Sequence, residues 1–523
     1  MNRARQNKNF WNTRKTLTQD SISSDELYDV VIIGAGITGI TLGNELQKRN
    51  KKCLILEKEY PGSGTTGKST AFINNFLETP YDELIQCFGE SKAKVIADQA
   101  QETIQYIYQN IKNYQIRCEH KKCNFYLFST EKEQNEKLTQ ILKAHTSLGI
   151  PTKRIYELPF DIPYKKALEI EGQLQFHPLK YLKRLLQEFE KNGGQLLSHC
   201  AVLSCNSQDD MVVIKTEDKK NILSKKVVWA THNPPADTRL NLLVTPYISY
   251  ALCGNLKNTP PKIAQGGDLE KPYHYFRYHK SGKDYKIIAG GFDHKAGQEN
   301  STKNPFEDLE EYVKERFTLE VKNKWFAPYY TSADGLPYIG LMPGEQNIYV
   351  ATGFGGDGML YGSMAARIIP ELMDGKESEI SQLLSPCRSH HICSAQSIIH
   401  ENVNSFFKHI HQRQNAELNF DLENIEKGEG KLTQCQGKTF AVYRDTGDSL
   451  HYLSPLCTHM GCTVQWNTTE KTWDCPCHGS QFEPNGRVIH GPALKNLEVV
   501  KIEHPEKEEA TPKKMTENKF INP

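Results

Sequence analysis

The sequence predicts a mixed α/β body followed by a small all-β domain, and three stretches carry this prediction. Near the start, the segment "YDVVIIGAGITGITLGNEL" (28–46) combines an apolar strand, a glycine-rich turn and an amphipathic helix. From about residue 416, short segments alternate apolar and polar residues between glycine-containing turns, as in "GKTFAVYRDTGDSLHYLSPL", which is typical of antiparallel strands. Between these parts, apolar residues at helical spacing over 398–410 predict a helical connector.

Length and charge limit the class of protein. The chain has 523 residues, enough for two or three domains of roughly 100–200 residues each. Its 64 basic and 63 acidic side chains leave a net charge of +1, so no basic face is implied and nucleic acid is not an expected partner. No stretch approaches the ~18 consecutive apolar residues that a spanning helix needs, so we expect no membrane span.

Cysteine usage and the two ends of the chain bear on its location. The 14 cysteines are scattered and do not form a disulfide scaffold, so the protein is expected to be cytoplasmic. The arm over 1–27 begins with several basic residues and no acid, which leaves a mitochondrial presequence as an alternative, although no apolar helical stripe accompanies them. The polar tail over 505–523 is expected to be disordered.

The glycines of the first turn, Gly34, Gly36 and Gly39, have the spacing of a dinucleotide-binding loop. The first permits a tight turn, the second lets the backbone approach a pyrophosphate, and the third allows close packing of helix on strand. The amino end of the helix supplies N–H donors and a positive dipole end for the phosphates. A second strand, "KCLILEKE" (52–59), contains Glu57 at its end, suitably placed to bind ribose hydroxyls. These features predict a Rossmann-like domain, with a glycine turn in another α/β fold as the alternative.

The next glycine-rich stretch, "GSGTTGKSTAF" (62–72), fits the pattern of a P-loop, but its position argues against one. A P-loop follows the first strand of its domain, and here the dinucleotide turn already occupies that place. The stretch instead resembles the second FAD-contacting segment of the D-amino-acid oxidase and glycine oxidase superfamily.

Further segments match the same superfamily in order along the chain. They are "LQFHPLKYLKRL" (174–185), "VVWATHNP" (227–234), "SADGLPYIG" (332–340) and "YVATGFGGDGMLYGSMAARII" (349–369). The resemblance covers about residues 28–375 and implies bound FAD. In the last segment, the glycine run opens a helix whose amino end would face the flavin, where its dipole can stabilise a reduced, anionic ring. The residues assigned to FAD are Gly34, Gly36, Gly39, Glu57, Thr66, Gly67, Ser69, Val202, Thr231, Gly353, Gly355, Gly356, Gly358 and Met359.

The resemblance also implies how the α/β body is divided. An FAD-binding part would be built from discontinuous segments, and a substrate part with an antiparallel sheet would be inserted into it. The expected boundaries are about 28–75, 166–244 and 331–375 for the FAD part, 76–165 and 245–330 for the substrate part, 376–415 for the connector and 416–504 for the C-terminal domain.

Two short clusters near the C-terminal end, "CTHMGC" and "CPCHGS", hold four cysteines and two histidines. Cys457-x-His459 and Cys475-x-x-His478 resemble the ligand pattern of Rieske [2Fe–2S] proteins, in which one iron takes two thiolates and the other takes two imidazoles. Histidine in place of cysteine makes such a cluster less anionic and raises its potential. A Cys/His zinc site is the alternative, but it does not explain the extra cysteine in each loop.

The extra cysteines, Cys462 and Cys477, are also explained by this resemblance. In Rieske proteins of the cytochrome bc type, cysteines at these positions form a disulfide between the cluster loops, so a disulfide is implied here, with two buried thiols as the alternative. "HGPA" (490–493) resembles the proline loop that covers the cluster. Those proteins also carry a tyrosine that donates to a ligand sulfur; this chain keeps Ser480 but has Phe482 at the tyrosine's place, which implies a lower potential.

Taken whole, the chain resembles bacterial FAD-dependent oxidoreductases fused to a C-terminal Rieske domain, including at "NFWNTRK" (9–15) and "LLSPCRS" (383–389). Rieske oxygenases, a rival match, generally lack the extra cysteine pair. The resemblance implies a dehydrogenase that oxidises a C–N bond of a small amine or amino acid and passes electrons singly from FAD through the cluster to a one-electron acceptor protein or quinone. The alternative is an electron-transfer protein between a reduced carrier and a respiratory or oxygenase partner, without its own organic substrate.

Candidate substrate contacts come from three further places. "YHYFRYHK" predicts a strand with Tyr275 and Arg277 on one side, and Arg277 is a candidate to clamp a substrate carboxylate, with a sheet ion pair as the alternative. Tyr250 and Tyr330 are candidates for the cavity wall. "GGFDHKAG" (290–297) is expected to form a solvent-exposed turn rather than a contact with flavin or substrate.

Overall fold

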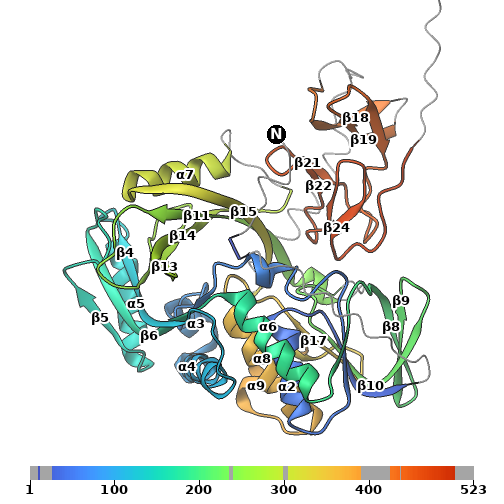
Figure 1. Cartoon of the computed structure of the whole chain (residues 1–523), viewed down its shortest axis with the longest axis horizontal. Helices are drawn as coiled ribbons and strands as arrows, with labels where there is room; N and C mark the ends of the chain where they lie inside the picture. Colours follow the sequence, from blue (N-terminus) through green and yellow to red (C-terminus); the bar gives the residue numbers. More distant parts are fainter. Residues whose placement is uncertain are drawn as a thin grey trace, which may run out of the picture.

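The computed structural model describes residues 10–11, 26–234, 239–297, 304–389, 425–435 and 438–500. They form an α/β body with two sheets and a small β-domain beside it (Figure 1). The expected disordered tail, most of the N-terminal arm and most of the helical connector lie outside these residues. No helix in the described parts of the chain is both long enough and apolar enough to cross a membrane.

The first sheet carries the glycine turn. Its strands are β1 (Leu27–Ile33), β2 (Cys53–Leu56), β7 (Gln195–Leu197), β8 (Val202–Gln208), β9 (Met211–Thr216), β10 (Asn221–Trp229), β16 (Tyr338–Leu341) and β17 (Ile348–Thr352). They follow the order β16–β17–β10–β1–β2–β7, and β8 and β9 extend as a hairpin from β10. Strand β1 pairs in parallel with both β10 and β2, and its last four residues are all buried, as expected for a central parallel strand.

Three helices pack against this sheet: α2 (Ile37–Gln47), α6 (Pro178–Lys191) and α8 (Gly358–Met373). Helix α2 contacts both of the others, and small residues permit the close approach. A Cβ on Gly43 would lie 2.8 Å from the Phe189 ring, and one on Gly362 would lie 2.6 Å from Thr38 Oγ1. The helix that follows the glycine turn is therefore held firmly in place.

The second sheet is larger and mostly antiparallel. Its strands are β3 (Phe72–Ile73), β4 (Lys121–Ser129), β5 (Thr152–Ile155), β6 (Lys166–Gln175), β11 (Val244–Leu256), β12 (Gln265–Gly267), β13 (His274–Ser281), β14 (Asp284–Lys295) and β15 (Leu319–Ser332). Their order is β15–β11–β14–β13–β12–β4–β6–β3, with β5 beside β6. The expected boundary at residue 166 is wrong, because β6 pairs with β4 along its length and belongs to this sheet.

Helices cover both faces of the second sheet. Helix α7 (Pro305–Arg316) packs on one face, and α3 (Tyr81–Phe88), α4 (Glu90–Asn113) and α5 (Asn135–Ser147) lie on the other side. Strand β4 contributes alternately to the two cores, with Phe125 and Leu127 in one and Tyr126 and Phe128 in the other. This alternation is the period of a strand that is buried on both faces.

The C-terminal domain is all β, as the alternating segments predicted. One sheet contains β18 (Gly430–Cys435), β19 (Lys438–Arg444) and β20 (Leu450–Leu453); the other contains β21 (Gln465–Asn467), β22 (Thr472–Asp474), β23 (Gln481–Phe482) and β24 (Val488–His490). Trp473 and Phe482 lie opposite each other in adjacent strands and are fully buried. The two cysteine–histidine loops follow β20 and β22.

The C-terminal domain packs closely on the body, beside β15 (Figure 1). A Cβ on Gly297 would lie 2.6 Å from Pro476, and one on Gly479 would lie 2.7 Å from Pro246. Contacts this tight leave no room for side chains at the two glycines. The loops that carry the cysteines and histidines therefore face the body.

Candidate functional site

A cavity of 1170 Å³ lies where the two sheets and the C-terminal domain meet. It exceeds the roughly 300–1,000 Å³ of usual small-molecule pockets, so it has room for a cofactor together with a substrate. Its walls come from the glycine turn and β2, from β11, β13, β14 and β15 of the second sheet, and from residues 487–494 of the C-terminal domain.

The end of the cavity beside β1 has the features of a dinucleotide site. Gly34 has φ +107°, and a Cβ there would lie 2.5 Å from the Ala230 carbonyl oxygen, so only glycine fits this turn. The Ala35 N–H donates to Glu57 Oε2 at 2.8 Å. Burial raises the pKa of Glu57, although the N–H groups of Glu59 and Ala35 oppose this effect. Glu57 lines the cavity, and its binding of ribose hydroxyls stays a prediction.

Most residues assigned to FAD line this cavity, namely Gly34, Gly36, Glu57, Thr66, Ser69, Val202, Thr231, Gly355, Gly356, Gly358 and Met359. Gly39, Gly67 and Gly353 do not. A Cβ on Gly39 would lie 1.9 Å from Gly34 O, and one on Gly67 would lie 2.2 Å from Gly62 O, while Gly353 has φ +73°. These three glycines shape the backbone around the cavity and do not form its wall.

The amino end of α8 reaches the cavity but already has a carboxylate beside it. The Gly356 N–H donates to Glu78 Oε2, and the Glu78 N–H donates to Asp357 Oδ2 at 2.8 Å. Glu78 and Asp357 both line the cavity. The positive end of the helix therefore meets protein carboxylates there, which the sequence motifs did not reveal.

The wall formed by the second sheet is aromatic. Tyr273 and Tyr275 line it with ring centroids 5.7 Å apart and an angle of 27° between their planes. Asp293 lies beside them on β14, and the Tyr329 hydroxyl donates to Asp293 Oδ2 at 3.0 Å. Strand alternation had placed Tyr275 on one side of its strand, but nothing in the sequence reasoning singled out Tyr273, Asp293 or Tyr329.

The proposed carboxylate clamp, Arg277, is a wrong prediction. Its side chain is fully buried and does not line the cavity. The Arg277 guanidinium donates to the backbone carbonyls of Thr70 at 2.6 Å and Phe176 at 3.1 Å, and it lies 5.3 Å from the centre of the Trp11 ring. Arg277 therefore ties the N-terminal arm and the segment after β6 to the second sheet.

Tyr250 and Tyr330 are buried but do not line the cavity either. The Tyr250 hydroxyl lies 2.9 Å from His294 Nε2, and Tyr330 donates weakly to His478 O at 3.3 Å and Gly491 O at 3.4 Å. Their neighbours along the strands line the cavity instead, because successive residues point to opposite faces. The expected exposed turn around His294 is also wrong, since these residues belong to β14.

The cysteine–histidine loops bring the four predicted ligands together. The Cys457 and Cys475 thiols are buried and lie within hydrogen-bonding reach of each other. The His459 and His478 rings lie edge to face, with centroids 5.0 Å apart and an angle of 87° between their planes. His478 Nδ1 is buried without a hydrogen-bond partner among the described residues, as a ligand atom would be. Two thiols beside two imidazoles are the donor set of a Rieske cluster, so the residues present fit that group.

A disulfide joins Cys462 to Cys477 and links the two loops, as the resemblance implied. Behind the thiols, the Ser480 hydroxyl lies within hydrogen-bonding reach of Cys457 and accepts the Ala493 N–H at 2.9 Å. Phe482 is fully buried in the same core as the two predicted ligand cysteines, Cys457 and Cys475. Ser480 therefore connects the cluster loop to the proline loop, and Phe482 contributes no hydroxyl.

We expect the Phe482→Tyr variant to have a higher cluster midpoint potential than the natural protein, and Ser480→Ala to have a lower one. A hydroxyl donor stabilises negative charge on sulfur and so favours the reduced cluster. Only the difference in hydrogen-bond strength between the oxidation states reaches the potential, so we expect shifts of some tens of millivolts. Redox titration of the EPR signal measures both potentials. An unchanged potential in Phe482→Tyr would contradict the expectation that a hydroxyl at this position donates to a ligand sulfur.

Two histidines that the FAD motifs did not identify line the cavity where the body meets the C-terminal domain. His232 and His490 both line the cavity, with ring centroids 6.4 Å apart. Burial lowers the pKa of His232 to about 4 and that of His490 to about 3, so both rings are neutral at physiological pH. On the same side, Asn241 Nδ2 lies 3.3 Å from His459 Nε2. The histidine edge of the cluster site thus faces the body.

The family model described as FAD dependent oxidoreductase matches residues 29–372, which is more than half of the chain. The chain belongs to this family. A second model, the Rieske [2Fe-2S] domain, matches residues 419–501. The protein is thus an FAD-dependent oxidoreductase that binds FAD in the body and a [2Fe–2S] cluster in the C-terminal domain.

Individual relatives agree with this family assignment. The chain is 32% identical over 509 residues to a putative Rieske 2Fe-2S iron-sulfur protein, YhfW, of Bacillus subtilis, covering 94% of this chain and 97% of that protein. Among solved structures, it is similar in fold to glycine oxidase from Geobacillus kaustophilus, with a TM-score of 0.59, 17% identity, and coverage of 69% of this chain and 99% of the other. L-proline dehydrogenase from P. horikoshii gives a TM-score of 0.58 at 19% identity, with coverage of 69% and 97%.

We expect FAD to be bound noncovalently. Some amine-oxidising relatives attach flavin through a histidine near the segment equivalent to 60–72 or through a cysteine before "ADGLP", and this oxidoreductase has no histidine in 60–72 and no cysteine in 322–333. Precipitation with acid should therefore release the yellow colour into the supernatant. Colour that stays in the pellet would contradict this expectation.

Proposed function

We propose that the protein is a dehydrogenase that oxidises a C–N bond of a small amine or amino acid and passes the electrons singly through the Rieske cluster to an external one-electron acceptor protein or quinone. FAD supplies the two-electron chemistry when bound, since it accepts a hydride from the carbon beside the nitrogen. The substrate loses this hydride and an N–H proton and becomes an imine. Because the cluster carries one electron at a time, the acceptor takes the two electrons in two steps.

The wall that the cavity shares with the cluster domain carries this proposal. Residues 487–494, which include the proline loop, line the cavity directly. Tyr330 also contacts the carbonyl of His478, one of the cluster ligands predicted from the motif. A flavin in this cavity and a cluster in these loops would therefore be neighbours in one chain, without a diffusing carrier between them.

The side chains of the second sheet support the oxidation of an organic substrate. The rings of Tyr273, Tyr275 and Phe125 line the cavity beyond the glycine motifs and give that end an aromatic wall. Burial raises the pKa of Asp293 to about 6, close to the value that suits a group that takes up the N–H proton. A protein that only relayed electrons would have no need of such a pocket.

Anaerobic reduction tests the proposed function. Oxidised protein is mixed with amines, amino acids and NADH in turn, and flavin absorbance and the EPR signal of the cluster are recorded on the same samples. We expect an amine or an amino acid to bleach the flavin and the signal of the reduced cluster to follow. Bleaching by NADH alone would favour the electron-transfer alternative, and a bleached flavin beside a cluster that stays oxidised would contradict the route.

A further inference from the structure

We infer that the substrate is a cationic amine without a carboxylate group, held between Glu78, Asp293 and the rings of Tyr273 and Tyr275. This inference rests on the proposed function and narrows its substrate class, which so far included amino acids. An aliphatic diamine is the simplest molecule that meets the requirements of these side chains.

Three carboxylates gather in the cavity near the second sheet. Glu78, Asp293 and Asp357 all line it, and the charges of the other two each act on Glu78. Asp293 Oδ2 accepts a hydrogen bond from Tyr329, and the Ser249 hydroxyl also lies within reach of this carboxylate. Its buried Oδ1 atom has no hydrogen bond of regular geometry among the described residues. A buried acceptor without a donor is costly. An ammonium group supplies both N–H donors and a charge of the right sign.

The tyrosine pair provides a second surface that suits a cation. Tyr273 has 39% of its surface exposed, and the side chain lines the cavity beside Tyr275. The Tyr275 hydroxyl lies 3.1 Å from Ser249 Oγ, which fixes its ring. A Cβ on Gly290 would lie 2.4 Å from that ring, so glycine makes room for it. Cations bind over aromatic faces within about 6 Å of the ring centre, and a desolvated site strengthens the interaction.

Among the described residues, the basic side chains that line the cavity are Lys58, Lys68 and Arg487. Lys58 and Lys68 both act on His490, and Arg487 pairs with Glu483 at 2.8 Å. Lys68 Nζ also lies 5.6 Å from the centre of the Phe326 ring on β15. The strands of the second sheet contribute no lysine or arginine to the described lining of the cavity. A substrate carboxylate there would be a buried charge without a compensating cation from this wall, which is strongly unfavourable.

The titration of the three carboxylates supports the same conclusion. Burial raises the pKa of Glu78 to about 8, with the charge of Asp357 adding to the effect. Burial likewise raises the pKa of Asp357 to about 7 and that of Asp293 to about 6, although hydrogen bonds from Ser249 and Tyr329 oppose the effect on Asp293. A bound cation favours the charged carboxylates and lowers all three pKa values. Binding near neutral pH should therefore release protons.

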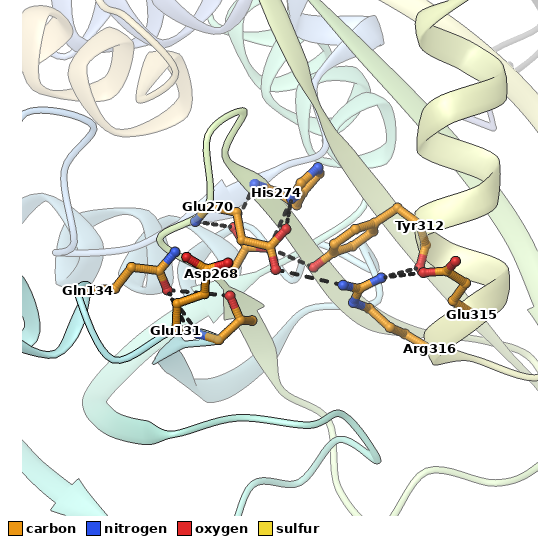
Figure 2. Close-up of polar contacts among 9 residues, drawn as sticks. Glu131, Gln134, Asp268, Glu270, His274, Tyr312, Glu315 and Arg316 are labelled. Atoms are coloured by element: carbon orange, nitrogen blue, oxygen red, sulfur yellow. Dashed lines mark hydrogen bonds and ion pairs between the residues drawn. The ribbon is translucent and has the colours of Figure 1, made fainter.

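The loop that carries Tyr273 is anchored from behind. Asp268 accepts hydrogen bonds from the N–H groups of Glu270 at 3.1 Å and His274 at 3.0 Å, from His274 Nδ1 at 2.9 Å and from the Tyr312 hydroxyl at 2.7 Å (Figure 2). These anchors flank the segment in which Tyr273 lies. The tyrosine is thus presented to the cavity by a fixed loop.

The charged groups of Asp268, Glu270 and His274 are already paired with other groups of the protein. Asp268, Glu270 and His274 lie close enough together to hold a metal ion. However, Arg316 places a cation 3.7 Å from Glu270, and the donors described above already surround Asp268 (Figure 2). The network is therefore assigned a structural role behind the cavity wall.

Binding of putrescine, a short aliphatic diamine, and of glycine to the holoenzyme tests the inference. Calorimetry on holoenzyme that has been reduced beforehand under anaerobic conditions reports binding without turnover, and bleaching of the oxidised flavin reports oxidation. We expect putrescine to bind at least roughly tenfold more tightly than glycine, because only the amino acid brings a carboxylate. Calorimetry in buffers of different ionisation enthalpy should also detect proton release when putrescine binds.

Two variants and a control locate the site. We expect Asp293→Asn and Glu78→Gln each to weaken putrescine binding by roughly tenfold, since each removes a carboxyl group that can become charged beside the bound ammonium. Asp284→Asn is the control, because Asp284 is exposed at the other end of the same strand as Asp293. FAD content and the cluster EPR signal identify variants that fail to fold.

The outcomes separate this inference from the proposed function. If glycine or another amino acid binds and bleaches the flavin while putrescine does neither, the substrate class is wrong and the proposed function stands. If no amine and no amino acid bleaches the flavin, the proposed function fails and the inference fails with it. Unchanged putrescine affinity in both folded variants would overturn the assignment of Asp293 and Glu78.

Discussion

A Cys457→Ser variant should lose the EPR signal of the reduced cluster while keeping its FAD and its reduction by substrate. Cys457 is one of the two buried thiols that meet between the cluster loops, and a serine hydroxyl does not replace a thiolate ligand of a [2Fe–2S] cluster. Its core is separate from the core under the first sheet, so the FAD site should survive. Turnover with a one-electron acceptor should fall to background, because electrons would reach FAD from the substrate but could not pass through the cluster to the acceptor.

The exposed Cys387 provides the matched control for this experiment. It lies outside the C-terminal domain, and Cys387→Ser should keep the EPR signal, the FAD content and the turnover of the natural protein. Loss of FAD together with the cluster in Cys457→Ser would contradict the independence of the two domains. Continued turnover without a cluster would mean that electrons leave the flavin by another route.

The cysteine–histidine loops and the glycine turn could be predicted because each of their patterns lies within a short segment of the sequence. Cys457 and His459 are two residues apart, and Cys475 and His478 in the second loop are three residues apart. The same holds for Gly34 and Gly36, whose positions depend on one strand and one helix. Sites of this kind need only local geometry, which the order of residues specifies directly.

The wall of the second sheet could not be predicted in this way, and the segment around Asp293 illustrates why. Two glycines before it indicated a turn. In the structure, Gly290 leaves space for the Tyr275 ring, and a Cβ on Gly291 would lie 2.6 Å from the Tyr273 carbonyl oxygen. The glycines therefore allow neighbouring strands to pack closely. This role can be recognised only once the pairing of β13 with β14 is known.

Arg277, Tyr250 and Tyr330 were misplaced for a related reason. A strand pattern assigns a side chain to one of two faces but does not say what lies opposite that face. Tyr330 turns toward the C-terminal domain, while its neighbour Tyr329 lines the cavity. Arg277 shares a face with Tyr275, but it lies beyond the cavity, under Trp11. Contacts between segments far apart in the sequence decide these positions.

The two glycines Gly36 and Gly39 should respond differently to alanine, because one lines the cavity and the other only packs. A Cβ on Gly39 would lie 1.9 Å from the Gly34 carbonyl oxygen, and backbone at that position has no rotamer with which to move aside. We expect Gly39→Ala to destabilise the protein by about 3 kcal/mol or more and to abolish FAD binding. Thermal unfolding of the FAD-free protein and flavin content after purification measure the two effects.

Gly36→Ala is the matched variant within the same turn. Its Cβ would meet only the side-chain oxygen of Thr66, at 3.0 Å, and its φ of −86° is accessible to alanine. We therefore expect the FAD-free Gly36→Ala protein to unfold close to the natural temperature but to bind FAD more weakly, since the added methyl group projects where the backbone approaches the pyrophosphate. Equal losses of stability in the two variants would contradict the separate roles, because packing alone would then explain both glycines.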